Sequence, residues 1–171
     1  MKFFAMIAML CTAVALTAAE TAMLSENSEA KSPSKGATVT VKDGVITMEG
    51  KSGTDKYNYL FTRVTVNPVV TQGKKFSVTI EPASTFAGDT IYFKGLNAQG
   101  KEVFSYVAYA IPAKKATYVI EFGKTTSPFR WLDAQIKTAP ETPVAFLQFF
   151  YGRATKESDM KVTISDIKLV D

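Results

Sequence analysis

The chain has 171 residues, a formal net charge of +4 and no histidine. Without histidine, it cannot perform Ser-His-Asp or Cys-His catalysis or bind a metal ion through imidazole. Its lysines and arginines are interspersed with acidic residues and never form a run longer than two, whereas a nucleic-acid-binding protein concentrates its positive charge on one stripe. The composition therefore predicts a solvated surface and no nucleic-acid partner.

The start of the chain has the pattern of a secretory signal peptide. Lys2 precedes an apolar run over residues 3–16, and small residues follow that run. The run is shorter than the roughly 20 apolar residues that a membrane-spanning helix needs, which favours cleavage over membrane anchoring. We therefore expect a bacterial protein that is secreted, periplasmic or at the cell surface, with no membrane partner after cleavage.

Cleavage is expected after Ala18 or Ala19, so residues 1–19 are assigned to the signal peptide. A later candidate site follows Ala30. Cys11 is the only cysteine of the chain and lies within the apolar run. The mature protein would therefore have no disulfide to stabilise it, unlike many small secreted domains. Its remaining length is sufficient for a hydrophobic core to stabilise it instead.

The rest of the chain divides into a short polar segment and one long β-rich region. Residues 20–36 are polar and rich in serine, which predicts a tether. From Ala37 onward, β-branched and aromatic residues alternate with polar ones in short runs, separated by turn signals such as Asp43-Gly44. The predicted strands cover residues 37–41, 45–48, 57–66, 76–80, 90–96, 102–110, 117–122, 144–151 and 160–170. No helical period is sustained, so residues 37–171 are expected to form one all-β domain, a sandwich or barrel of about nine antiparallel strands.

The last predicted strand changes face partway along its length. Val162 and Ile164 have the same parity. Ile167 and Leu169 have the other parity, although the side chains of a strand alternate strictly between its two faces. The sequence therefore predicts a β-bulge near residues 165–166 and a strand that is buried inside a sheet.

The predicted strand over residues 57–66 has the clearest functional pattern. Its apolar face is the expected core face. The other face carries Tyr57, Tyr59, Phe61 and Arg63. Aromatic rings stack on the C–H faces of pyranose rings and a guanidinium group hydrogen-bonds to pairs of hydroxyls, so this face could bind sugar. The same pattern also fits a sheet that is covered on both sides, with the aromatic residues in a second layer of core.

Three further residues are candidates for the same site. Tyr106 lies on the predicted strand over residues 102–110. Gln148 lies among apolar neighbours, where a buried amide needs a partner from the protein or from a ligand. Trp131 lies in a long connection and could stack on sugar or close the open end of the sandwich. Residues 130–136 of that connection could form an additional edge strand.

Four stretches of the chain together resemble carbohydrate-binding modules of families four, nine and twenty-two: residues 37–48, 70–80, 115–122 and 162–169. These modules often contain a Gly-Lys-x-Phe-x-Val strand, which residues 73–78 match. The resemblance implies a galactose-binding-like jelly roll that recognises a poly- or oligosaccharide through an aromatic-lined sheet face. In such modules a polar residue on the strand of Gln148 often reaches the sugar.

The resemblance also bears on metal binding. The opening segment that helps such modules to bind a structural calcium ion is missing from this chain. Only Asp166 matches the closing calcium-associated position, and one carboxylate cannot supply the six to eight oxygens of a calcium shell. We therefore expect no bound metal and no other cofactor.

Two functions remain in competition at this point. A secreted, non-catalytic carbohydrate-binding module is favoured by the aromatic face and the resemblance. A structural or protein-interaction β-sandwich of a bacterial surface assembly would have the same fold without a sugar site. An enzyme is not expected, because glycoside hydrolysis needs two facing carboxylates and the acidic residues are scattered along the chain.

Overall fold

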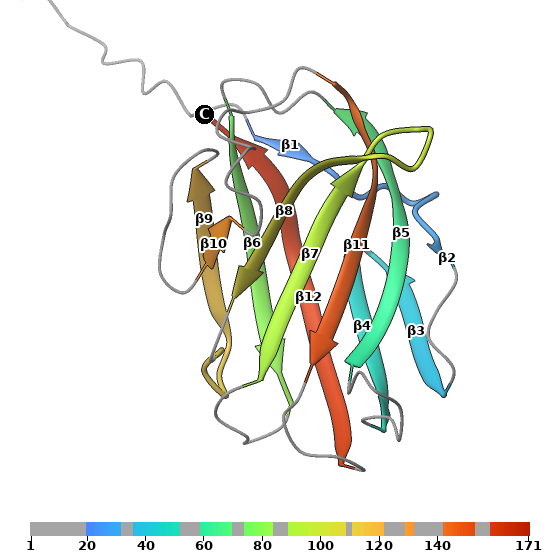
Figure 1. Ribbon diagram of the computed structural model, residues 1–171, viewed down its shortest axis with the longest axis vertical. Helices are drawn as coiled ribbons and strands as arrows, with labels where there is room; N and C mark the ends of the chain where they lie inside the picture. Colours follow the sequence, from blue (N-terminus) through green and yellow to red (C-terminus); the bar gives the residue numbers. More distant parts are fainter. Residues whose placement is uncertain are drawn as a thin grey trace, which may run out of the picture.

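The computed structural model describes residues 20–31, 36–51, 59–69, 74–83, 89–108, 111–121, 129–131, 142–152 and 158–171. Throughout these ranges the regular structure consists of β-strands, which form two antiparallel sheets packed face to face (Figure 1). Within the same ranges, no helix has the length and apolarity needed to cross a membrane. The predicted all-β sandwich is confirmed.

The first sheet, here called the threonine sheet, has the strand order β3-β4-β12-β6-β9, and β1 also pairs with β12. Its strands are β1 (Thr21–Ala22), β3 (Ala37–Lys42), β4 (Val45–Lys51), β6 (Lys75–Pro82), β9 (Ala116–Glu121) and β12 (Asp159–Val170). The long strand β12 lies between β4 and β6, so the last predicted strand is indeed an interior one.

The second sheet, here called the aromatic sheet, has the strand order β10-β8-β7-β11-β5-β2. Its strands are β2 (Ala30–Lys31), β5 (Tyr59–Val69), β7 (Thr90–Leu96), β8 (Glu102–Ala108), β10 (Phe129–Trp131) and β11 (Val144–Gly152). The chain passes repeatedly between the two sheets, as it does in jelly rolls. In the described part of the chain, nine strands have six residues or more and three are shorter, which agrees with the predicted nine.

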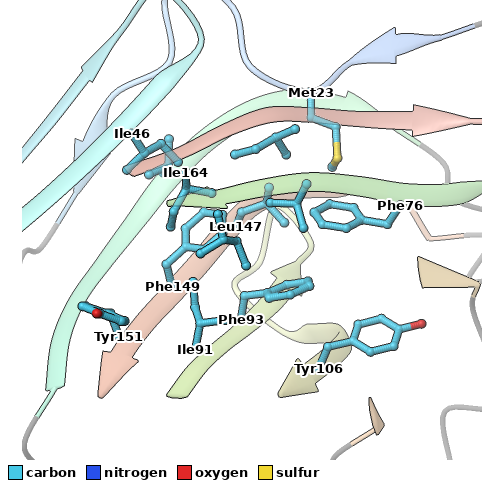
Figure 2. Packing of buried hydrophobic residues seen from close by; sticks show 14 of the residues in the cluster. Met23, Ile46, Phe76, Ile91, Phe93, Tyr106, Leu147, Phe149, Tyr151 and Ile164 are labelled. Carbon is cyan, nitrogen blue, oxygen red and sulfur yellow. The ribbon is translucent and has the colours of Figure 1, made fainter. Parts of the chain in front are cut away.

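The hydrophobic core fills the space between the two sheets. Its largest fully buried side chains include Phe76 of the threonine sheet and Phe93 and Phe149 of the aromatic sheet. The rings of Phe76 and Phe93 stack across the interface, with centroids 5.1 Å apart and an interplanar angle of 26° (Figure 2). Burying each such side chain stabilises the fold by about 1.5–3 kcal/mol relative to leaving it exposed.

The predicted bulge in β12 is confirmed. The pairing of β12 with β6 shifts register between Ser165 and Lys168, and Asp166 adopts a positive φ of 50°. Aspartate tolerates this left-handed conformation better than most residues. The bulge moves the inward-facing positions from one parity to the other, so Ile164 and Ile167 are both buried.

The predicted tether is wrong for residues 20–31. Strand β1 extends the threonine sheet beside β12, and strand β2 extends the aromatic sheet beside β5. Met23 lies between them, donates its N–H to the Ile167 carbonyl at 3.0 Å, and has a fully buried side chain (Figure 2). The segment is polar overall, but Met23 and Leu24 are both buried and belong to the hydrophobic core. Residues 32–35 lie outside the described ranges.

Candidate binding face

The two sheets present different chemistry on their outer surfaces. The outward positions of the threonine sheet carry a mixture of threonines, such as Thr40 and Thr163, and charged residues, such as Lys42, Glu49 and Lys161. The outer surface of the aromatic sheet, here called the aromatic face, carries these half-buried or nearly buried side chains: Tyr59, Phe61, Arg63, Tyr92, Lys94, Phe146, Gln148 and Phe150. They come from three neighbouring strands, β5, β11 and β7, in the middle of the sheet (Figure 1).

Pairing between strands arranges these side chains in rows across the sheet. Phe61, Phe150 and Tyr92 are direct cross-strand partners and form the aromatic row. The Phe150 ring stacks on Tyr92 with centroids 4.9 Å apart and lies 4.8 Å from the ring of Phe61. Such ring pairs stabilise one another beyond the area that they bury, so the row is a well-packed apolar platform.

A pocket adjoins one side of the aromatic row. The next row contains Tyr59, Gly152 and Thr90 as cross-strand partners, and Gly152 has no side chain to fill its centre. The resulting pocket has a volume of about 390 Å³ and is lined by these three residues together with Tyr92 and Phe150. Its size falls within the range of about 300–1,000 Å³ that is typical of ligand pockets. Tyr59 forms one wall, with its ring edge-on to Phe150 at a centroid distance of 5.3 Å.

A second row of hydrogen-bonding groups, here called the polar row, lies on the other side of the aromatic row. It consists of Lys31, Arg63, Gln148, Lys94 and Ser105, each paired with the next across the sheet. With its amide oxygen facing the guanidinium group, Gln148 accepts hydrogen bonds from Arg63 Nε at 3.1 Å and Nη2 at 2.9 Å. The guanidinium carbon of Arg63 also lies 5.7 Å from the centre of the Phe146 ring. These contacts hold the guanidinium group in place on the face.

Lys94 is held at the other end of the polar row. Its Nζ forms an ion pair with Glu102 and lies 5.3 Å from the centre of the Tyr92 ring. Ser105 Oγ donates to the same carboxylate at 2.8 Å. Partial burial alone would lower the pKa of Lys94, but the contacts with Glu102 and Tyr92 outweigh that effect and the pKa is raised. Lys94 is therefore a fixed cation whose charge is already matched by a carboxylate.

The structure brings three of the six candidate residues together: Tyr59, Arg63 and Gln148 lie on the aromatic face. Tyr57 lies outside the described residues. Trp131 pairs in register with Tyr106 through strand β10, and its side chain also lies outside what the structure describes. That strand supports the expectation of an additional edge strand near residue 130. The functional role of all these residues remains a prediction.

The placement of Tyr106 on the binding face is wrong. Its side chain is fully buried between the sheets, and its hydroxyl donates to the Glu121 carbonyl at 3.3 Å (Figure 2). Burial raises the pKa of this phenol. Strand β8 has buried residues on both faces, so alternation along the sequence could not identify its core face; pairing with Phe93 of β7 fixes it.

Sequence reasoning did not identify four residues of this face as site residues: Tyr92, Lys94, Phe146 and Phe150. The signal for Phe146 and Phe150 was present, because both share the parity of Gln148. Tyr92 and Lys94 alternate with the buried residues Ile91 and Phe93, so the alternation along β7 also indicates its outward face. Only strand pairing shows that these residues lie beside the face of β5.

The proposed calcium-associated residue has another structural role. Asp166 is exposed and occupies the positive-φ position of the β12 bulge. Among the residues that the structure describes, no group of three or more potential metal ligands comes together. The described structure therefore gives no support for a metal site at Asp166.

No protein-family model matches the chain, and no curated protein is significantly similar to it in sequence. Solved structures are similar in fold. A family 11 carbohydrate-binding module from a cellulosomal cellulase of Clostridium thermocellum superposes with a TM-score of 0.55 at 19% identity, over 90% of this chain and 95% of the module. A family 29 module in complex with mannohexaose superposes with a TM-score of 0.50 at 13% identity, over 91% of this chain and 93% of the module.

Larger proteins contain a similar fold. The structure of PfGH50B superposes with a TM-score of 0.60 at 13% identity. The match covers 90% of this chain but only 24% of PfGH50B. The agarase AgWH50C gives a TM-score of 0.52 at 8% identity, over 88% of this chain and 23% of the agarase. This chain therefore spans about a quarter of their length. These two modules belong to families other than those of the sequence resemblance, but the fold is confirmed: the chain has the β-sandwich jelly roll of carbohydrate-binding modules.

Proposed function

We propose that the domain binds a poly- or oligosaccharide, without catalysis, on the aromatic face. The observation that carries this proposal is the aromatic row directly beside the polar row. The two rows are two residues apart along each strand, or about 7 Å. A sugar can therefore lay its C–H face on the rings of Phe61, Phe150 and Tyr92 while its hydroxyls reach Arg63 and Gln148.

The similar structures support the same interpretation. One family 11 module was solved with a mixed-linked β-1,3-1,4 tetrasaccharide and one family 29 module with mannohexaose. Identities of 13–19% support a shared fold and do not extend those ligands to this chain. The described carboxylates beside the face, Glu29 and Glu102, form ion pairs with Lys31 and Lys94. This arrangement supports binding without hydrolysis, which needs an acid and a second carboxylate across the scissile bond.

The first test is the variant Tyr59→Ala, which removes one wall of the pocket. We expect wild-type dissociation constants of about 10 µM to 1 mM for soluble oligosaccharides, because an open face desolvates its ligand only in part. The variant should bind at least tenfold more weakly, a loss of about 1.4 kcal/mol. Its free energy of unfolding should fall by less than about 1 kcal/mol, since Tyr59 is only half buried. Calorimetry measures the first quantity and denaturant unfolding the second.

Two further variants make this test specific. Gly152→Leu should fill the pocket and weaken binding while every aromatic ring is retained. Thr163→Ala, on the outer surface of the threonine sheet, is the matched control and should bind like the wild type. A folded wild type that binds no member of a broad glycan array would reject the proposal in favour of a protein-interaction module of a surface assembly.

We also propose that the protein is exported and loses its first residues by cleavage. The support is the sequence pattern of Lys2 and the apolar run over residues 3–16. The early cleavage site fits the fold better than the one after Ala30, because Met23 belongs to the core and Glu20 forms an ion pair with Lys168 at 2.8 Å. N-terminal sequencing of protein from the native host should give a first residue at position 19 or 20. A retained Met1 or a start at Lys31 would contradict this expectation.

A further inference from the structure

The polar row carries more positive charge than its carboxylates neutralise. Lys31 forms an ion pair with Glu29, and Lys94 forms one with Glu102. Arg63 lies between these two pairs in the row, and its partner across β5 and β11 is the neutral amide of Gln148. Within the described residues, no carboxylate lies within ion-pair distance of Arg63.

The geometry of Arg63 suits a bidentate anionic partner. The oxygen of Gln148 accepts from one edge of the guanidinium group, Nε and Nη2. The other edge, formed by Nη1 and the second N–H of Nη2, can still donate two parallel hydrogen bonds to a carboxylate or sulfate. Arg63 is half buried and its guanidinium lies near the ring of Phe146, so its charge is only partly solvated. A partly desolvated cation interacts more strongly with an anion than one in bulk water.

The identity of residue 148 supports the same conclusion. A glutamate there would have nearly the same shape and would form a salt bridge with Arg63 across the two strands. Glutamine orients the guanidinium group through the same edge but supplies no charge, so among the described residues Arg63 has no carboxylate partner. The pair therefore holds a cation in a fixed orientation at the centre of a face that is built to stack on sugar rings.

We propose that the aromatic face selects acidic glycans, whose carboxylate or sulfate ester binds Arg63 while the sugar ring lies on the aromatic row. This inference rests on the proposed function of the same face. It adds the chemical class of the ligand: a polysaccharide of uronic acids or of sulfated sugars in place of a neutral one. The two kinds of acidic glycan share the chemistry that Arg63 recognises, and the experiment separates them.

The experiment compares matched pairs of ligands by calorimetry. One pair is tetragalacturonate and its methyl ester, and the other is a sulfated galactan tetrasaccharide and its desulfated form. The acidic member of at least one pair should bind the wild type at least ~10-fold more tightly than its neutral counterpart, as expected for a charge-assisted bidentate contact. Raising NaCl from about 20 mM to about 500 mM should reduce this preference several-fold, because salt screens the attraction. The pair that shows the preference identifies the acidic group.

Two variants assign the preference to Arg63. Gln148→Glu supplies an internal carboxylate, and Arg63→Gln removes the cation. In both, the ratio of acidic to neutral affinity should fall to about one. Lys42→Gln is the control, since it removes one positive charge from an exposed position on β3 of the opposite sheet and should leave the ratio unchanged. Denaturant unfolding establishes that each variant is folded before its binding is interpreted.

The outcomes separate this inference from the proposed function. Binding of the acidic and neutral members with equal affinity would overturn the inference and leave sugar binding intact. An acidic preference that Lys42→Gln lowers as much as Arg63→Gln does would reflect net charge and would also overturn the role of Arg63. A folded wild type that binds neither member of either pair, nor any other glycan, would reject both proposals.

Discussion

A chain that begins at Ser32 is expected to be less stable than one that begins at Glu20 by at least about 4 kcal/mol. The shorter chain lacks β1, β2 and the fully buried side chain of Met23. Besides the pairing of β1 with β12 and of β2 with β5, it lacks three further backbone hydrogen bonds to the sandwich, at Ile167, Asn67 and Thr65. Removing a buried methionine side chain alone typically costs about 2–5 kcal/mol, because it leaves a cavity in the core. Denaturant unfolding of the two chains measures the difference.

Point substitutions distinguish core packing from the other effects of truncation. Met23→Ala should lose about 2–4 kcal/mol, whereas Met23→Leu, which nearly conserves volume, should lose less than about 1.5 kcal/mol. Glu20→Gln breaks only the exposed ion pair with Lys168 and should cost less than about 1 kcal/mol. Equal stability of the long and short chains would mean that residues 20–31 act as a tether after all.

Substitution of Gly95 by alanine is expected to destabilise the fold by about 3 kcal/mol through overpacking. Gly95 lies in β7 with the ring of Phe104 packed directly over it, so a Cβ atom would overlap that ring and lie 2.7 Å from its Cδ1 and Cζ. Phe104 cannot easily move, because its ring also contacts Phe76 at 6.1 Å and Tyr106 at 6.0 Å between centroids. The Phe104 ring therefore occupies the space that a side chain at position 95 would need.

A double-mutant cycle with Phe104→Leu tests this explanation. If the clash with the ring is the cause, Gly95→Ala should cost less in the Phe104→Leu background, with a coupling energy of about 1–2 kcal/mol. Denaturant unfolding of the four proteins provides the cycle. Strictly additive losses would contradict the clash with the Phe104 ring as the cause of the destabilisation.

Local patterns in the sequence predicted much of the fold. The alternation in β5 identified its core face, and the parity change in β12 identified its bulge, because side-chain direction along one strand depends only on residue spacing. The Met23-Leu24 pair gave no comparable signal, since two apolar residues within a polar segment have no period. Their burial depends on how the two sheets pack together, which no local sequence pattern describes.

The candidate site was predicted in part, for a related reason. The outward aromatics of β5 were visible in its alternation, but the rows depend on strand register between segments that are far apart in the sequence. Gln148 was recognised as an amide in need of a partner, yet only the pairing with β5 shows that the partner is Arg63. Tyr106 was misplaced because β8 has buried residues on both faces.

The interior position of β12 has a consequence for the biogenesis of the protein. Strand β12 pairs Ile164 with Ile46 on one side and with Ile80 on the other, so the threonine sheet cannot be completed before β12 has been synthesised. At a synthesis rate of about 5–20 residues per second, β4 must wait on the order of ten seconds for its partner. During that interval the apolar strands of the nascent chain lack their partners, so this is the stage of synthesis at which the chain is most prone to aggregation.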